Sequence, residues 1–262
     1  MATQTETVQY TDLNAEKFPE PVEPIKIDKW NISASTVDMK DPVVASTIGL
    51  FMIHALLRRS LRCVARQART VEPGKRAAFV TYAKAALELL HDHHGHEEHL
   101  WFPLMQPYVD FSESSHEHEE IERLMTHGLE LLKTAQAHVN ARNDASAPAW
   151  PGEEISTTTE RLVELLLPHL QKEETLACLY GRRAPLSVYH DFEEKIQDAV
   201  SKMMKRIGFV WSAAYQLRHF SKKEKEVFPP MPAVVRGVIG FLGWLLYGKE
   251  LAFGPTEEEL RN

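Results

Sequence analysis

The amino-acid sequence predicts an all-α protein, an up-down-up-down four-helix bundle followed by additional C-terminal helices. Four long segments place apolar residues at the spacing of one helical face, and the connections between them are short or contain proline. A motif of the form E-L-L-x-x-H-x-x-x-E-E-x-L also occurs twice, at residues 88–100 and 164–176. Two of the four helices therefore share one internal pattern.

The boundaries of the bundle helices follow from capping and helix-breaking residues. Asp41 is a suitable N-cap and Pro42 a suitable first residue for the first helix. Phe102-Pro103 should end the second helix, Gly181 is placed to be the C-cap glycine of the fourth, and Pro168 should kink the fourth helix. The helices are expected at residues 42–67, 75–101, about 112–140 and about 156–180, with a loop at 141–152.

Three regions are expected along the chain: an N-terminal arm at residues 1–40, the bundle at 41–181 and a C-terminal helical extension at 182–262. The arm is polar and rich in proline, so it either wraps around the bundle or is a disordered leader. In the extension, residues 187–220 predict one long helix. The residues expected to stop that helix are Pro229, Pro230 and Pro232.

The segment 233–247 is an apolar run interrupted only by Arg236. Its length of about 15 residues is short of the roughly 20 that a spanning helix needs. Two interpretations stay open: a helix packed on the bundle, where it could wall a substrate pocket, or a weak contact with a membrane surface or a second copy.

Composition restricts the function and the cellular location. The chain has 262 residues and a net charge of −7, which argues against a nucleic-acid partner because phosphate binding needs a clustered basic surface. Its two cysteines, Cys63 and Cys178, both fall in helical patterns, which suits a reducing compartment. The first six residues are polar and lack the apolar run of a secretory signal. We therefore expect an intracellular, cytoplasmic protein without a transmembrane span.

Each copy of the repeated motif places a histidine and a glutamate four residues apart, on the apolar face of its helix. These pairs are His93 with Glu97 and His169 with Glu173. A buried carboxylate without a partner costs several kcal/mol, and neither apolar stripe offers a lysine or arginine. A metal ion is a partner that accepts imidazole nitrogen and carboxylate oxygen together.

The first and third helices each add a single histidine in mid-stripe, His54 and His118. One histidine on an apolar face is more often a satisfied core residue than a ligand, but four such helices together indicate a metal site. Four imidazoles and two carboxylates suit two metal ions bridged by the carboxylates, and the absence of thiolate favours iron or manganese. The candidate ligands are His54, His93, Glu97, His118, His169 and Glu173.

The first motif has a register ambiguity, because His94 and Glu98 also stand four residues apart. Aligning the two motif copies selects His93 and Glu97 as the counterparts of His169 and Glu173. The remaining histidines of the segment are expected to face solvent or to support the ligands. They are His91, His94, His96 and His99.

These residues resemble the hemerythrin-like HHE cation-binding family over roughly residues 41–181. The resemblance is carried by the two HxxxEE motifs in register with the two single histidines. It implies a non-haem di-iron centre, oxo- or hydroxo-bridged, that binds or activates O2, with manganese as the alternative metal. It further implies that Glu97 and Glu173 bridge the ions, with His54 and His93 on one ion and His118 and His169 on the other.

The sequence departs from the oxygen-carrying members of that family at one position. Those members have a further histidine one turn after the third-helix histidine, where this chain has Glu122. Glu122 either ligates a metal or lies on the helix surface beside Arg123. A charged ligand or a vacant position both argue for oxygen activation over simple carriage.

Two functions follow as hypotheses, together with a metal-free structural alternative. The first is a redox enzyme that uses O2 or peroxide to oxidise a small molecule. The second is a sensor, buffer or carrier of iron, O2 or NO that signals through its C-terminal helices. The missing fifth histidine and the large extension favour the enzyme.

Overall fold

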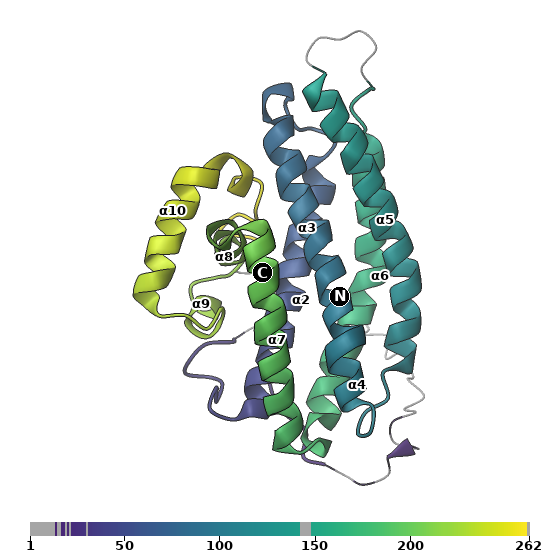
Figure 1. The fold of residues 1–262 in the computed structure, drawn as a ribbon, viewed down its shortest axis with the longest axis vertical. Helices are drawn as coiled ribbons and strands as arrows, with labels where there is room; N and C mark the ends of the chain where they lie inside the picture. The colour runs from purple at the N-terminus through teal and green to yellow at the C-terminus, as the bar shows by residue number, and fades with distance from the viewer. Residues whose placement is uncertain are drawn as a thin grey trace, which may run out of the picture.

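The computed structural model describes residue 14, residues 17–18, residue 20 and residues 22–29, 31–141 and 148–260. Most of the polar arm up to residue 21, and part of the loop expected at 141–152, lie outside the described residues. Four long helices form an antiparallel bundle, which confirms the predicted fold class (Figure 1). They are α2 (Pro42–Gln67), α3 (Arg76–His96), α5 (Ser112–Asn140) and α6 (Gly152–Tyr180).

The first helix begins and ends where the sequence places it. The Asp41 carboxylate accepts a hydrogen bond from the backbone N–H of Val43 at 2.9 Å, as an N-cap should. A short 3-10 turn, η1 (Pro73–Lys75), leads into α3. Among the described residues, α2 is long and apolar enough to cross a membrane by length and composition, but more than half of its most apolar stretch is buried. Its apolar residues form the core of the bundle.

The fourth helix starts earlier than expected, at Gly152. Ser156, expected near the helix start, is instead inside the helix and donates a hydrogen bond to the Ala65 carbonyl of α2. Pro168 lies within α6 without ending it. Gly181 does not adopt the left-handed C-cap conformation, because its φ is −53° and the chain continues into the 3-10 turn η3 (Gly181–Arg183).

The second helix changes its geometry at the motif. After α3 the chain forms a single π-helical turn, η2 (Glu97–Trp101), and then the short helix α4 (Phe102–Met105). Pro103 lacks an N–H and disfavours a regular α-helix before it, so the wider turn falls on the residues just ahead of the proline. The π turn starts at Glu97, one of the candidate ligands.

The prediction of one long helix over residues 187–220 is wrong. Gly208 has a φ of +96° and separates α7 (Leu186–Ile207) from α8 (Phe209–Arg218). Glycine adopts this conformation without the steric cost that a Cβ imposes, so the residue acts as a corner between two helices. Two more helices follow, α9 (Glu224–Val227) and α10 (Ala233–Leu251).

The extension packs along the bundle beside α2 and α3 (Figure 1). The Arg59 guanidinium of α2 makes two bonds of 3.0 Å to the Glu224 carboxylate of α9. The buried His219 donates from Nδ1 to the Tyr215 carbonyl and accepts the Tyr82 hydroxyl of α3 at Nε2. One apolar core runs from the bundle into the extension. The expected boundaries at residues 40 and 181 stay predictions.

The described part of the arm lies against the bundle. Ile25 and Ile32 are buried, and the backbone N–H of Ile25 donates to the Cys178 carbonyl of α6 at 2.8 Å. This part of the arm therefore wraps around the bundle, as the first of the two alternatives predicts.

We expect Gly208→Ala to lower the free energy of unfolding by about 1 to 2 kcal/mol, because an L side chain at this positive φ is strained. Thermal and urea unfolding measure the effect. Gly74→Ala is the matched control, since nothing lies within 4 Å of a Cβ there and it should cost little. Equal loss in both variants would contradict a conformational role for Gly208.

Candidate metal centre

All six candidate ligands meet in the interior of the bundle. Helix α2 supplies His54, α3 supplies His93, the π turn supplies Glu97, α5 supplies His118, and α6 supplies His169 and Glu173. Each of these side chains is at least nine-tenths buried. The convergence expected from sequence spacing is therefore present in the fold.

The six residues divide into two halves that the carboxylates join. His54 and His93 face each other with their Nε2 atoms 3.1 Å apart, and His118 and His169 do so at 3.0 Å. Glu97 places Oε1 3.3 Å from His93 Nε2 and Oε2 3.6 Å from His118 Nε2.

Glu173 spans the halves in the same way. It places Oε2 3.6 Å from His54 Nε2 and Oε1 3.3 Å from His169 Nε2. Both carboxylates therefore lie between the two histidine pairs, the arrangement that bridging ligands require.

Outer carboxylates determine which imidazole nitrogens face the centre with a free lone pair. Glu174 accepts from Nδ1 of His54 at 3.1 Å, Glu98 from Nδ1 of His118 at 2.7 Å, and Glu117 from Nδ1 of His169 at 3.0 Å. A neutral imidazole that carries its proton on Nδ1 has only a lone pair on Nε2. His118 and His169 thus point two acceptors at each other across 3.0 Å.

Two acceptors at this distance repel unless a cation lies between them. All four carboxylate oxygens of Glu97 and Glu173 are likewise buried without a hydrogen-bond partner. Native proteins rarely leave such groups unsatisfied. The donor set therefore fits metal ions, with Nε2 and carboxylate oxygen as the ligand atoms.

Burial also shifts the pKa values of the side chains at the centre. Burial lowers the pKa of His54 to about 4, and burial also lowers the pKa of His118 and of His169, which favours the neutral ligand form. Burial, followed by the neighbouring Glu173, raises the pKa of Glu97 well above its ordinary value. Placing two carboxylates here without a cation is therefore unfavourable.

His94 lies beside the six candidate ligands, so the expectation that it faces solvent is wrong. Its ring is buried, stacks on His118 at 4.0 Å between centroids, and has no hydrogen-bond partner on either nitrogen. Together with Glu97, His118 and His169 it forms one group whose ligand atoms lie within 4.8 Å of one another. The other such group consists of His54, His93, Glu97 and Glu173.

Repeat alignment missed His94 because adjacent helical residues differ by about 100° in direction, and a four-helix centre is wide enough to receive both. His93 faces one half of the centre and His94 the other. A fifth imidazole therefore lies at the centre, and it comes from α3.

Glu122 lies outside both groups. Its carboxylate is 3.3 Å from Nδ1 of His91, and the side chains of His91 and Glu122 are 60% and 42% exposed. The structure thus favours the surface alternative for Glu122. His99 is exposed as expected, and His96 is half-buried outside both groups.

The three outer carboxylates are the further site residues that the sequence reasoning passed over. Glu98 and Glu174 are the second glutamates of the two EE pairs, so the repeat itself contained the signal. Arg58 contacts Glu174 at 2.6 Å, and Lys172 contacts Glu117. Burial alone would raise the pKa of Glu174, but the hydrogen bonds from His54 and Arg58 lower it overall.

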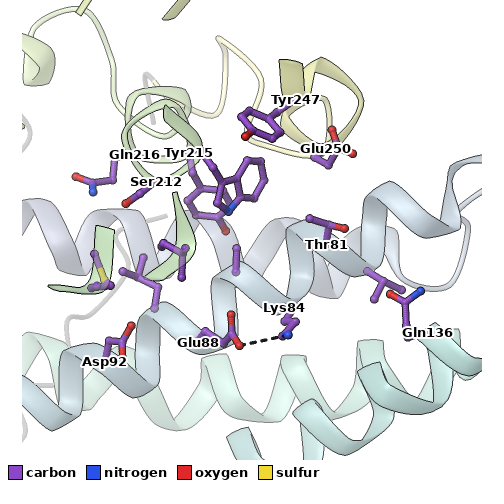
Figure 2. A pocket seen from close by; sticks show the side chains of 16 residues that line it. Thr81, Lys84, Glu88, Asp92, Gln136, Ser212, Tyr215, Gln216, Tyr247 and Glu250 are labelled. Atoms are coloured by element: carbon purple, nitrogen blue, oxygen red, sulfur yellow. Dashed lines mark ion pairs between the residues drawn. The ribbon is translucent and has the colours of Figure 1, made fainter. Parts of the chain in front are cut away.

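A separate cleft of about 490 Å³ lies between α3, α8 and α10 (Figure 2). Trp211, Tyr215 and Tyr247 contribute aromatic rings from the extension. Asp92, next to His93 in the sequence, lines its α3 side, but no candidate ligand lines the cleft. The extension therefore lines a pocket, at the side of the bundle.

Comparisons with known proteins establish the family of this chain. A family model, the hemerythrin HHE cation-binding domain, matches residues 50–180. The chain is 33% identical over 217 residues to xanthocillin biosynthesis cluster protein F of Aspergillus fumigatus, covering 82% of this chain and 93% of that protein. No solved structure matches. The chain belongs to the hemerythrin HHE cation-binding family.

We expect His94→Ala to weaken metal binding at one half of the centre, because the variant removes a buried ligand atom. Metal content after loading with ferrous iron should fall from about two ions per chain toward one. His91→Ala is the control, since that ring is largely exposed and outside the centre. Full metal content in His94→Ala would restrict the ligands to the original six residues.

We expect Glu98→Gln and Glu174→Gln each to reduce metal affinity by roughly 10- to 100-fold, the usual cost of removing a carboxylate that orients a ligating histidine. Competition with a chelator measures the affinity. Glu119→Gln on the exposed face of α5 is the matched control, with a side chain that is 79% exposed. Unchanged affinity in both test variants would show that the Nδ1 partners do not control the site.

Proposed function

We propose that this protein holds two iron ions at the centre and uses them to bind O2 and oxidise a small organic molecule. The observation that carries the proposal is the pair of four-residue groups that share Glu97. His54 and His93 would hold one ion, and His94, His118 and His169 the other. Glu97 and Glu173 would join the two ions, with manganese as the alternative metal.

A reduced iron pair supplies two electrons to O2 or peroxide when it is bound. The residues of the chain provide the setting for that chemistry. The outer carboxylates keep Nδ1 protonated and Nε2 available, and two buried carboxylates balance part of the charge of the ions. Phe102 stacks on His118 at 5.7 Å and helps to exclude water.

The two halves differ in their number of imidazoles. The half with His54 and His93 has two, and the half with His94, His118 and His169 has three. Fewer protein ligands leave a coordination position open, which catalytic and gas-binding metal sites need. We infer that O2 reaches the His54 half.

The proposal that the substrate is a small molecule is supported by the relative and by the cleft. The relative named above is called a biosynthesis cluster protein and aligns over nearly its whole length. A biosynthetic setting suits an enzyme that modifies a small molecule. The cleft beside α3 is one place where this chain could hold such a molecule.

Reversible O2 binding is the second candidate, and a specific observation favours it. The fifth imidazole, which the sequence lacks at the position of Glu122, would be supplied by His94, a member of one of the two groups. Five histidines are the set that the oxygen-carrying members of the family use. The departure at Glu122 therefore no longer favours activation over carriage, and a sensor or carrier is a real alternative.

Oxygen uptake by the ferrous protein tests both functions. We expect anaerobically loaded protein to consume O2, to develop the absorption of a ferric pair, and not to return the O2 when the gas phase is exchanged. Full recovery of O2 would establish the carrier, and failure to bind iron would reject both functions. Glu122→Gln should behave as the wild type, because Glu122 lies outside both groups.

A further inference from the structure

Helix α10 exposes an unusual amount of apolar surface. Val234 is 79% exposed, Trp244 68% and Phe241 61%. Isolated apolar residues are common on protein surfaces, but a contiguous patch marks a contact with another body. The large apolar side chains exposed on this helix are Val234, Val235, Val238, Phe241, Trp244, Leu245 and Leu246.

The opposite side of the helix attaches it to the rest of the protein. Ile239, Gly243 and Leu251 are its buried residues. Gly243 lies so close to α8 that a Cβ there would collide with Ala214. The Tyr247 ring packs on Trp211 at 5.2 Å. Helix α10 is therefore held along one side, at the outer edge of the molecule (Figure 1).

The exposed apolar residues cover a wide arc. At about 100° per residue, Trp244 and Leu246 stand about 200° apart around the helix axis, and the other exposed apolar residues fall between them. No charged residue occurs between Arg236 and Lys249. The arc is thus continuous and apolar. Arg236 lies on the attached side of the helix, where its guanidinium donates to the Met231 carbonyl, and Lys249 and Glu250 follow the arc at the end of the helix.

This width favours a lipid surface over pairing with a single helix of a second copy. A partner helix covers a stripe of roughly 100°, so a helix pair cannot bury Trp244 and Leu246 together. A bilayer interface receives a broad apolar face, accepts aromatic rings at its boundary and tolerates cations at the helix ends.

The chain's net charge also bears on the type of lipid. A charge of −7 disfavours attraction to an anionic surface, so the apolar arc must supply the binding energy. The proposal therefore concerns a neutral lipid surface. The attachment of α10 to α8 along its inner side argues for a helix that lies in the interface without crossing it.

We propose that the outer face of α10 inserts into the interfacial layer of a lipid bilayer, with the helix parallel to the surface. This inference is independent of the metal centre. It places the protein at a membrane surface, with the bundle on the water side.

Flotation with vesicles of neutral phosphatidylcholine tests the proposal on the full chain. We expect the wild type to float with the vesicles, and binding to persist in about 0.5 M salt because it is apolar. Phe241→Glu/Trp244→Glu should reduce the partition coefficient at least about tenfold. Leu186→Glu at the start of α7 is the matched control, since Leu186 is 54% exposed and lies on another helix.

Thermal unfolding of the variants checks that each remains folded, which is expected because all three positions are exposed. Light scattering measures self-association in the absence of lipid. A wild type that stays out of the vesicle fraction overturns the proposal, as does equal flotation of the Phe241/Trp244 variant. A wild-type dimer that the double variant dissociates, without vesicle binding, would assign the face to a second copy.

Discussion

Two imidazole lone pairs that face each other in the interior of the bundle are the constraint around which the site is built. His118 and His169 approach to 3.0 Å through Nε2, while carboxylates at Nδ1 hold both rings in the tautomer that leaves Nε2 bare. Apolar packing cannot relieve this repulsion, and two acceptors cannot form a hydrogen bond with each other. A cation can, which explains why four helices bring nitrogen and carboxylate oxygen together in an otherwise apolar core.

The EE pairs show how one short motif supplies both layers of the site. The first glutamate of each pair, Glu97 or Glu173, points into the centre. The second, Glu98 or Glu174, turns toward a neighbouring helix and accepts a hydrogen bond from Nδ1 of the single histidine there, His118 or His54. Adjacent residues on a helix differ in direction by about 100°, so one dipeptide can serve two helices. The repeat thereby links each motif helix to one of the single-histidine helices.

The extension gives the bundle features that the metal site does not require. Its α8 shares the apolar core of α2 and α3, and its α9 is tied to Arg59. Its last long helix then presents an apolar face away from the bundle. Gly243 lets α10 approach α8 closely on its inner side, and the outer side is left exposed. A cleft lined by residues of α3, α8 and α10 lies between the two parts.

The sequence alone determined the four bundle helices, because apolar periodicity and caps such as Asp41 act locally. It also determined the six residues that meet at the centre, since a His/Glu pair on the apolar face of a helix is costly to bury unless a cation accompanies it. Only the tertiary structure decided the place of His94, because whether a neighbouring residue faces inward depends on the width of the interior. The tertiary structure also decided the corner at Gly208, because apolar periodicity does not reveal a positive φ. It likewise decided which side of α10 is exposed. An apolar run indicates which residues favour burial. The packing of the other helices decides which side of that helix is covered.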